Sequence, residues 1–416
     1  MTMGSSGADK FDIVIGGGGM IGTSLAIALA PLGLRIAVVE AVPRNAGEQP
    51  SFDDRSTALS RSTQRMYEAM GLWDEVIAAS TPIRRIHVSD RGRFGFSHID
   101  AEEQGVEALG YVVINRVLGD VLQTALRNVE NVSVYCPARV LGVETSAESA
   151  RVDAVGDKGD EFALECRLLV AADGANSNLR TLLGIGATRT DYGQHAVIGN
   201  LLPERPLDNC AYERFTDQGP LALLPVADDR AAFVWTVDSA DADRIMGLDD
   251  EEFLAEMQTA FGYRLGAFSR VGRRAGYPLA LSKAARLTAE RSVLAGNAAH
   301  GLHPVAAQGF NLGMRDVAAL CDCIADLQAS GAAADPGDPD MLQRYAEWRR
   351  DDQGKLVRLT DGIVRLFGSS RTPLRALRSV GMLGFDLVPG VRSLFARHMM
   401  GLSGKLPRLS RGLPLR

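Results

Sequence analysis

Cysteine is scarce in this sequence: the chain has five, and no two of them form a C-x-x-C pair. Because the number is odd and paired spacings are missing, neither a disulfide framework nor a zinc site is predicted, and a cytoplasmic location with reduced thiols is expected. No stretch approaches the roughly 18 uninterrupted apolar residues of a membrane-spanning helix. Residues 1–10 lack the basic start and apolar stretch of a secretory signal. The net charge of −6 gives no footprint of a nucleic-acid-binding protein.

The rest of the composition is that of an ordinary globular protein. Hydrophobic residues make up 46% of the chain and charged residues 23%, which excludes a disordered or fibrous protein. A length of 416 residues exceeds what one small core organises. The chain is therefore predicted to form two or three domains.

The first motif is a glycine turn between two strand-like runs. Residues 11–16 are mostly apolar, and the turn contains Gly17, Gly19 and Gly22. Glu40 ends a second apolar run, eighteen positions after the last glycine. The glycines permit a tight turn and a close approach of backbone to a pyrophosphate, which the helix N-terminus would bind, while the carboxylate would accept ribose hydroxyls. This order predicts a Rossmann-type dinucleotide site for FAD or NAD.

Two more motifs follow patterns of buried strands. Asp173 and Gly174 come directly after the apolar residues 168–172, and Ser177 and Arg180 follow at short offsets. Alone, such a motif is also typical of a simple turn and helix cap. The third motif, residues 296–316, is dense in Gly, Pro, His and Asn between a strand and a helix. A loop of this kind can place backbone N–H groups against a flat heterocycle.

The hydrophobic pattern separates two kinds of region. Strand, helix and strand are predicted over residues 11–40, and a strand leading into a helix over residues 109–126. Alternating, β-rich patterns occupy residues 83–99 and most of residues 187–282, which suggests a second sheet inserted into the first domain. Further helices are predicted near residues 61–72, 249–261, 313–327 and 341–366.

The three motifs, in this order, resemble those of the class A flavoprotein monooxygenases. The run from His303 to Asp316 and residues 108–118 are similar to the ubiquinone-biosynthesis hydroxylases of that class. The resemblance implies an α/β fold of the para-hydroxybenzoate hydroxylase type: a Rossmann-type FAD-binding domain, an inserted β-rich substrate domain and C-terminal helices. The implied limits are residues 1–80, 106–186 and 284–340 for the FAD-binding domain, 81–105 and 187–283 for the substrate domain, and 341–416 for the C-terminal helical region.

The resemblance also assigns residues to the cofactor. The ADP half of FAD would lie against Gly17, Gly19, Met20, Ile21, Gly22 and Glu40. The flavin's phosphate or ribityl chain would lie along Arg55 and Arg116, and transient NAD(P)H as well as FAD would contact Asp173 and Gly174. The ribityl chain would bind Asn297, and the isoalloxazine would lie against Pro304, Gln308, Gly309, Phe310 and Asn311.

Two residues depart from the common pattern of the class. Asn297 stands where most class A hydroxylases have Asp; an amide still accepts and donates hydrogen bonds but has no charge. The ubiquinone hydroxylases commonly have this Asn, so it favours the narrower resemblance. Ala307 stands where the signature usually has Gly, and its methyl group can crowd the flavin or alter a backbone angle.

Several side chains have two interpretations. His300 and His303 either form hydrogen bonds within the loop or transfer protons, a choice that depends on geometry. Cys321 and Cys323 are two apart on the predicted helix and are interpreted as packing residues.

Two surface features also remain open. Phe94 and Phe96 either line a substrate pocket or pack in a sheet. Residues 371–416 contain nine Arg or Lys and the single acid Asp386. This basic, amphipathic segment either meets anionic lipid or covers the FAD-binding domain with its arginines facing water.

The resemblance implies hydroxylation of the aromatic ring of a polyprenylated phenol in ubiquinone biosynthesis, through a flavin C4a-hydroperoxide formed from NAD(P)H and O₂. With one Rossmann fingerprint, NAD(P)H would bind transiently, and no catalytic base is nominated. The expected partners are the phenol, O₂ and a biosynthetic complex, with the inner membrane surface as a further contact. The alternatives are a soluble aromatic hydroxylase, an isoprenoid reductase and a flavoprotein scaffold without turnover.

Overall fold

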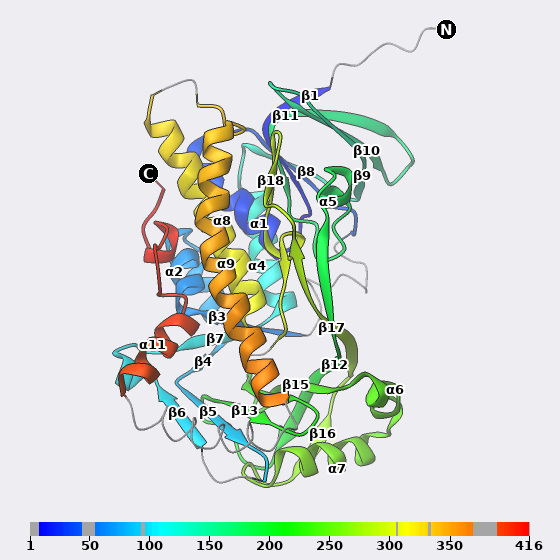
Figure 1. Ribbon diagram of the computed structural model, residues 1–416, viewed down its shortest axis with the longest axis vertical. Helices are drawn as coiled ribbons and strands as arrows, with labels where there is room; N and C mark the ends of the chain where they lie inside the picture. The colour runs from blue at the N-terminus through cyan, green and yellow to red at the C-terminus, as the bar shows by residue number, and fades with distance from the viewer. Residues whose placement is uncertain are drawn as a thin grey trace.

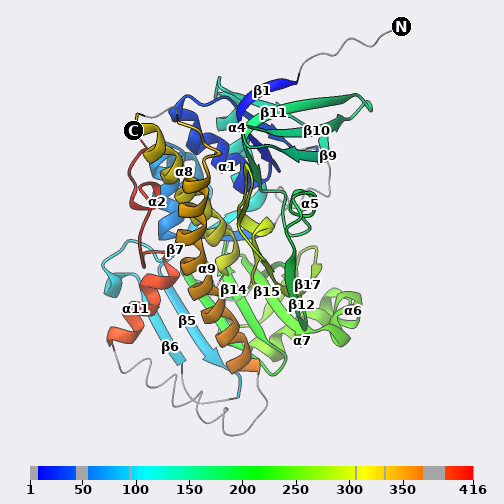
Figure 2. The ribbon, with the colours of Figure 1, turned by 45° about the horizontal axis from the view of Figure 1, so that its top comes forward.

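A computed structural model describes residues 8–43, 55–92, 96–304, 307–331, 334–368 and 389–415. Three sheets organise this part of the chain. In Figure 1 the sheet containing β1 lies at the top, the sheet containing β5 and β13 lies at the bottom, and the small sheet of β3, β7 and β4 lies between them. The long helix α9 (Pro339–Gly368) runs from the upper to the lower part, as Figure 2 shows from a second direction.

The upper sheet has a parallel centre. Its main strand order is β18-β19-β11-β1-β2-β8, with β10 and β9 added antiparallel beside β11. Ile13 and Ile15 face one hydrophobic core and Val14 faces another, so both faces of β1 are covered, as in parallel sheets generally. The strands are β1 (Asp9–Gly16), β2 (Ile36–Val39), β8 (Val132–Tyr135), β9 (Ala138–Thr145), β10 (Ala150–Gly156), β11 (Glu161–Ala171), β18 (Thr288–Ala289) and β19 (Ser292–Leu294).

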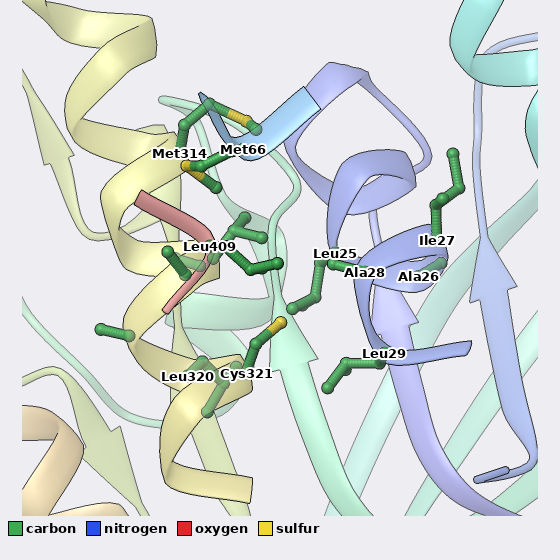
Figure 3. Close-up of a cluster of buried hydrophobic side chains, with 14 of the residues drawn as sticks. Leu25, Ala26, Ile27, Ala28, Leu29, Met66, Met314, Leu320, Cys321 and Leu409 are labelled. Atoms are coloured by element: carbon green, nitrogen blue, oxygen red, sulfur yellow. The ribbon is translucent and has the colours of Figure 1, made fainter. Parts of the chain in front are cut away.

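Helices pack on one face of this sheet and form the largest core. Figure 3 shows Leu25 and Leu29 of helix α1 (Met20–Leu29) pointing toward Cys321 of helix α8 (Gln308–Ala329). Almost every residue of α1 after its first turn is buried, because small side chains let neighbouring elements approach closely. This packing holds the N-terminus of α1 and the start of α8 in fixed positions. Helices α2 (Arg61–Ala69), α3 (Trp73–Ile77), α4 (Asn115–Arg127) and α5 (Asn178–Leu182) complete this half.

The lower sheet is mostly antiparallel and has nine strands in the described residues. Its order is β20-β17-β12-β15-β14-β13-β5-β6, with β16 beside β12. Helices α6 (Ser239–Gly247) and α7 (Asp250–Phe261) pack on one face, where Phe253 contacts Phe233 and Trp235. The strands are β5 (Arg85–Asp90), β6 (Phe96–Asp100), β12 (Ala187–Pro203), β13 (Cys210–Phe215), β14 (Pro220–Pro225), β15 (Ala231–Asp238), β16 (Phe268–Val271), β17 (Ala275–Ala284) and β20 (His300–Gly301).

The small sheet connects the two larger ones. Its order is β3-β7-β4, antiparallel throughout. A hydrophobic cluster joins Ile83 and Val112 of this sheet to Ala211 and Ala232 of the lower sheet. The strands are β3 (Ser56–Ser60), β4 (Ser80–Ile83) and β7 (Gly110–Ile114); the remaining elements are α11 (Pro389–Met399) and the short 3₁₀ turns η1 (Ala30–Leu32), η3 (Glu102–Gln104), η4 (Gly296–Ala298) and η6 (Leu409–Arg411).

The predicted α/β fold with a separate β-rich half is confirmed. The strand, helix and strand at residues 11–40 form as predicted, and residues 83–99 join the second sheet. The helix predicted at 313–327 begins earlier, at Gln308, because residues 308–312 continue its first turns. Helix α6 was not predicted, since Ala242 and Ile245 are too few buried positions to give a clear helical pattern. The domain limits stay a prediction.

Within the described residues, no helix is long and apolar enough to span a membrane. Cys321 and Cys323 are completely buried, and burial raises the pKa of both thiols, as expected for packing residues. Phe96 is exposed at the edge strand β6, while Phe94 lies outside the described residues. Residues 371–388 of the basic C-terminal segment, including Asp386, also lie outside them.

Candidate functional site

The predicted motifs meet at one edge of the parallel sheet. Strands β2, β1, β11 and β19 are parallel neighbours, so their carboxyl ends lie side by side. Gly17 follows β1, Glu40 follows β2, Asp173 follows β11 and Asn297 follows β19. In open α/β sheets, ligands bind outside the carboxyl ends of the strands. Residues separated by more than 270 positions are thus brought to one place.

The glycine turn fits a pyrophosphate. Gly17 has φ = +104°, a backbone conformation that residues with a Cβ rarely adopt. A Cβ at Gly22 would lie 1.9 Å from the carbonyl oxygen of Gly17, so this position also requires glycine. Helix α1 begins at Met20 after Gly19, with no side-chain cap and no acid in its first turn. Its first N–H groups are therefore available to an anion, as a bound diphosphate requires.

Glu40 is held by the same turn. One carboxylate oxygen accepts a hydrogen bond from the Gly18 N–H at 2.6 Å, and the other accepts one from the Val42 N–H at 2.8 Å. The side chain is half-buried. A carboxylate has about four acceptor positions, so two stay available for ribose hydroxyls. The arrangement fits the adenosine ribose of a dinucleotide.

Asp173 stabilises the turn that contains it. Its carboxylate accepts hydrogen bonds from the Ser177 hydroxyl and from the Leu179 N–H, and it thereby holds the start of α5. Arg180 donates to the Ala298 carbonyl at 2.9 Å and connects this motif to the third one. Gly174 has φ = +87°. The side chain of Asp173 thus orders two loops at the edge of the sheet, and direct contact with FAD or NAD(P)H stays a prediction.

Asn297 faces outward at this edge. It lies in the short turn η4 between two buried residues, Gly296 and Ala298, and is itself exposed. No residue in the described part of the chain hydrogen-bonds to its side chain. The amide can therefore both donate to and accept from the hydroxyls of a ribityl chain.

Residues of the third motif pack against neighbouring helices, both near Gly296 and at the start of α8. Ile21 at the start of α1 lies against Gly296 and Gly313, where a Cβ at Gly313 would lie 2.8 Å from the Ile21 Cδ1. Gln308, Gly309 and Phe310 form the first turn of α8; Gln308 is buried and donates to the Met399 carbonyl, and Phe310 packs on the core. Pro304 is half-buried just before this turn.

The two predicted arginines lie in different places. The Arg55 guanidinium lies over the Tyr277 ring, 5.0 Å from its centroid, just before strand β3. Arg116 is exposed in the first turn of α4. Contact of either arginine with the flavin's phosphates or ribityl chain stays a prediction.

Asn311 connects α8 to the small sheet. Its amide nitrogen donates to the carbonyls of Ala58 and Ala307, while its oxygen accepts from the Ser60 N–H and the Thr63 hydroxyl. All four hydrogen-bonding positions of the amide are thus used by the chain itself. The side chain orients the third motif, and its backbone is the part left to contact a flavin.

Replacing Asn311 by alanine is expected to lower the free energy of unfolding by roughly 3 kcal/mol, because buried polar groups on β3 and α2 lose their partner. The control is Asn178→Ala, which removes a single hydrogen bond to the Val140 carbonyl and should cost about 1 kcal/mol. Urea unfolding of both variants measures the difference. Equal stabilities would contradict this role for Asn311.

Ala307 has a left-handed backbone, with φ = +50° and ψ = +39°. This conformation costs a residue with a Cβ roughly 1–2 kcal/mol, which explains why glycine is usual at this position in the signature. The Ala307 N–H donates to the Pro304 carbonyl and closes the turn. The methyl group therefore affects the backbone of the loop that leads into α8.

Ala307→Gly is expected to raise the free energy of unfolding by about 0.5–1 kcal/mol, since relief of strain exceeds the added entropy of the unfolded chain. Ala299→Gly is the matched control: its φ is −88°, so the same change should destabilise the protein. Thermal unfolding of the three proteins gives the comparison. Destabilisation by both changes would show that the Ala307 backbone is not strained.

A buried ion cluster supports the third motif. The Asp316 carboxylate accepts hydrogen bonds from the Gly296 N–H at 3.0 Å, from the His300 Nε2 at 2.7 Å and from the Arg349 Nε at 2.6 Å. Burial alone raises the pKa of the Asp316 carboxyl, but His300 and Arg349 outweigh burial and hold it well below its usual range. Asp352 joins the cluster through Arg349. This cluster fixes both ends of the loop from 296 to 316.

The two histidines of the loop differ. His300 is buried against Asp316, while His303 is buried with its ring 5.3 Å from that of Tyr192. Burial lowers the pKa of His303 to about 4, so its ring is neutral at neutral pH. A neutral His303 favours the hydrogen-bonding interpretation over that of a proton donor.

Sequence reasoning missed Arg349 as a partner of the motif. The residue belongs to the predicted charged helix, but its charge is completely buried between α8 and α9 rather than exposed. The pairing of Asp316 with a helix 33 positions away has no local signal in the sequence. A buried acid inside a run of buried helix residues was the available hint.

Comparisons with known proteins agree with this geometry. The FAD binding domain family matches residues 10–360. Ubiquinone hydroxylase UbiL from Rhodospirillum rubrum is 37% identical, covering 98% of this chain and 94% of its own. The 3-demethoxyubiquinol 3-hydroxylase of Escherichia coli is 30% identical, covering 94% of this chain and 98% of its own.

Solved structures share the fold. The p-nitrophenol 4-monooxygenase PnpA from Pseudomonas putida superposes with a TM-score of 0.78 at 18% identity, covering 95% of this chain and 99% of its own. This likeness places the three sheets in the para-hydroxybenzoate hydroxylase type of fold. The chain belongs to the class A FAD-dependent aromatic monooxygenases, which use NAD(P)H as reductant, and within them to the ubiquinone-biosynthesis hydroxylase family.

Proposed function

We propose that this protein hydroxylates the aromatic ring of a polyprenylated phenol in ubiquinone biosynthesis, with FAD, NAD(P)H and O₂. The observation that supports the proposal is the meeting of the glycine turn, Glu40, the Asp173 turn and the Asn297 loop at one sheet edge. The names of the relatives, a ubiquinone hydroxylase and a demethoxyubiquinol hydroxylase, supply the class of substrate.

The two halves of FAD are proposed to bind different groups of residues at the two ends of the site. The turn of Gly17, Gly19 and Gly22, with Met20 and Ile21, would hold the diphosphate, and Glu40 the adenosine ribose. The ribityl chain would bind Asn297, with Arg55, Arg116, Asp173 and Gly174 in support, and the isoalloxazine would lie against the backbone of Pro304, Gln308, Gly309, Phe310 and Asn311. Bound FAD supplies electron transfer from NAD(P)H and activation of O₂.

The chain itself supplies position and a dry environment. The Asp316 cluster and Asn311 hold the third motif on both sides, so the loop beside the ring is fixed before substrate arrives. Exclusion of water around the reacting atoms protects the activated oxygen from decay. The proposed substrate domain, residues 81–105 and 187–283, contains most strands of the lower sheet, although β20 (His300–Gly301) pairs with that sheet from outside these limits.

We propose further that the C-terminal segment mainly covers the FAD-binding half. Arg408 pairs with Asp326 of α8, in the FAD-binding half, at 2.5 Å, whereas Arg392 pairs with Glu103, inside the proposed substrate domain, at 3.0 Å. Lys405 lies over the Trp348 ring at 4.3 Å. These basic side chains are used within the protein, which favours the covering role. Leu394 is 68% exposed on α11 and is the described residue that favours contact with an inner-membrane surface or a biosynthetic complex.

The test uses the purified, FAD-loaded protein and a phenol with a short isoprenoid tail. Oxidation of NADH or NADPH is followed in the presence and absence of the phenol, and products are identified by mass spectrometry. Substrate-stimulated oxidation with a hydroxylated product supports the proposal. A saturated isoprenoid product would favour the reductase, and a flavoprotein with neither product would be a scaffold.

A further inference from the structure

One carboxyl of the lower sheet, Glu213, has no hydrogen bond or ion pair to the part of the chain that the structure describes. Glu213 lies on β13, opposite Ala222 of β14 and beside Val88 of β5. Side chains alternate along a strand, so Glu213 shares a face with Ala211, while Tyr212 faces the core under α7. Glu213 therefore points away from α7 and toward the other sheets.

This face of the sheet lies toward the third motif. Ala211 packs in the same cluster as Ala58 of strand β3. The Ala58 carbonyl accepts a hydrogen bond from Asn311 at the start of α8. At the beginning of β3, Arg55 lies over Tyr277, a residue of the lower sheet. Strand β3 thus connects the face that contains Glu213 to the loop proposed to hold the isoalloxazine.

The two faces of the central strands differ in burial. On the side of α7, Leu221 and Leu223 of β14 are completely buried. On the opposite side Ala222, Val234 and Glu213 all keep accessible surface. Glu213 is therefore half-buried on the face that lies toward the third motif, rather than sealed in the core under α7.

Among the described residues, Glu213 has no partner for its charge. No described residue donates a hydrogen bond to the carboxylate or forms an ion pair with it. Burial raises the pKa of the Glu213 carboxyl to about 7, and no charged group from the neighbouring strands contributes to this shift. The contrast is Asp316, a buried carboxylate with four donors around it.

An unpartnered carboxyl deep in a protein lowers stability, because burial removes water without replacing its hydrogen bonds. A hydrogen-bond donor on a ligand would supply the missing partner. The neighbouring side chains on this face, Ala222, Val234 and Val88, are apolar and small. A flat aromatic ring with one hydroxyl fits such a surface better than a charged or strongly polar ligand.

We propose that Glu213 is a catalytic residue that accepts the hydrogen bond, and then the proton, of the substrate's phenol hydroxyl. This assignment rests on the proposed function as a phenol hydroxylase. The residue would determine which hydroxyl of the ring is oriented and activated for reaction.

Glu213 takes up one proton and returns it within each turnover. The phenol O–H bond breaks and its proton passes to the Glu213 carboxylate, while the electron pair on oxygen delocalises into the ring. A ring carbon then forms a bond to one atom of O₂ as the O–O bond breaks. That atom takes a proton from solvent and becomes the new hydroxyl, while the hydride of NAD(P)H and a second solvent proton convert the other atom to water. The ring carbon loses its hydrogen as a proton to solvent, and Glu213 returns its proton to the phenol oxygen. The carboxylate is thus restored after each turnover.

The apolar site makes this carboxylate a stronger base than an exposed one. A general base is most effective when its pKa lies near the working pH, and it contributes about 10²–10⁴-fold in rate. The pKa near 7 given by burial satisfies this condition. Above that value Glu213 is charged and accepts the proton; below it the group is neutral and the rate falls.

The test compares Glu213→Gln with the wild-type holoenzyme, using a phenol with a short isoprenoid tail. Product formation is expected to fall about 10²-fold or more, with NAD(P)H oxidation diverted to hydrogen peroxide. FAD content should stay unchanged, and thermal stability should stay equal or rise, because the variant has no buried charge. The acidic limb of the pH–rate profile, near 7, should disappear. Glu213→Asp keeps the acid and should retain the limb at a reduced rate. Glu161→Gln, an exposed site on β11, is the matched control and should behave as wild type.

Two readouts do not depend on turnover. Infrared difference spectra of the wild type should show a protonated carboxyl that titrates near pH 7 and is missing in Glu213→Gln. Flavin absorbance titrations should show tighter binding of the phenol than of its O-methyl ether in the wild type, and equal binding in the variant.

The outcomes separate the two claims. A wild type that hydroxylates the phenol, with Glu213→Gln matching it in rate, pH profile and ligand preference, would overturn the role of Glu213 and leave the proposed function intact. A wild type that binds the phenol through Glu213 but forms no hydroxylated product would overturn the proposed function and the proton transfer together.

Discussion

Replacing Gly22 by alanine is expected to remove FAD from the protein. The new Cβ would lie 1.9 Å from the Gly17 carbonyl oxygen, so the helix and the glycine turn must move apart. Binding of the diphosphate depends on the positions of the turn and of the α1 N-terminus. A displacement of about 1 Å in a site that works by exact positioning can lower its effectiveness about 100-fold. The variant should purify nearly colourless.

Flavin absorbance per protein and titration of the apoprotein with FAD measure this effect. Gly247→Ala is the control, because this glycine in α6 has open space around its missing Cβ and an ordinary backbone. Circular dichroism distinguishes lost binding from lost folding. A Gly22→Ala protein that keeps full flavin content would show that the turn does not bind the diphosphate.

The second large effect is expected at the buried ion cluster. Asp316→Asn leaves Arg349 in the core with one anionic partner fewer, and breaking a buried pair in this way costs about 3–5 kcal/mol. The double variant Asp316→Leu with Arg349→Met removes both charges. It should lose less free energy of unfolding than the sum of the losses in Asp316→Leu and Arg349→Met alone. Urea unfolding of the single and double variants gives the coupling energy. Additive costs would contradict an energetic link between the two residues.

The cluster also predicts that the free energy of unfolding falls at acid pH. Because the folded-state pKa of Asp316 lies below its unfolded value, its contribution is fully present above about pH 4 and is lost as the pH falls toward the folded pKa. Acid unfolding of the wild type should therefore include this carboxyl. Asp316→Asn, which has no carboxyl to protonate, should show a shallower loss of stability over the same range.

The local parts of the site could be predicted from the sequence. A strand, a glycine turn, a helix and a second strand ending in Glu40 occur within 40 residues, and each residue type has a direct physical reason. The strands before Asp173 and Asn297 are continuous apolar runs, so their carboxyl ends could be expected at the same edge. Pattern and residue chemistry agree at every one of these positions.

The parts that depend on distant pairing could not be predicted. Strand β5 pairs in parallel with β13, joining Arg85 to Cys210, and no local pattern specifies that register. Asn311 contacts Ser60, 251 positions away. The sequence of β13, from Cys210 to Phe215, does not show which side chains face the other sheets, so Glu213 could not be singled out before the sheet face was known. Such contacts are decided by the assembled sheets.

The departure at residue 307 shows how sequence and structure complement each other. The signature indicates glycine at this position, and the backbone explains why, because Ala307 has a left-handed conformation. The neighbouring turn of Asn311 is fixed by four hydrogen bonds that the motif alone does not show. The strained backbone of Ala307 and the hydrogen bonds of Asn311 that stabilise it therefore lie within one turn of each other, beside the proposed flavin ring.

The proposed reaction of this chain is the transfer of an oxygen atom to a phenol ring. The direct measurement is mass spectrometry of the product formed by FAD-loaded protein from a short-chain prenylated phenol, NAD(P)H and ¹⁸O₂. We expect a product heavier by one ¹⁸O atom on the ring, with NAD(P)H consumed in equal amount. A product without ¹⁸O, or NAD(P)H oxidation that yields hydrogen peroxide alone, would contradict it.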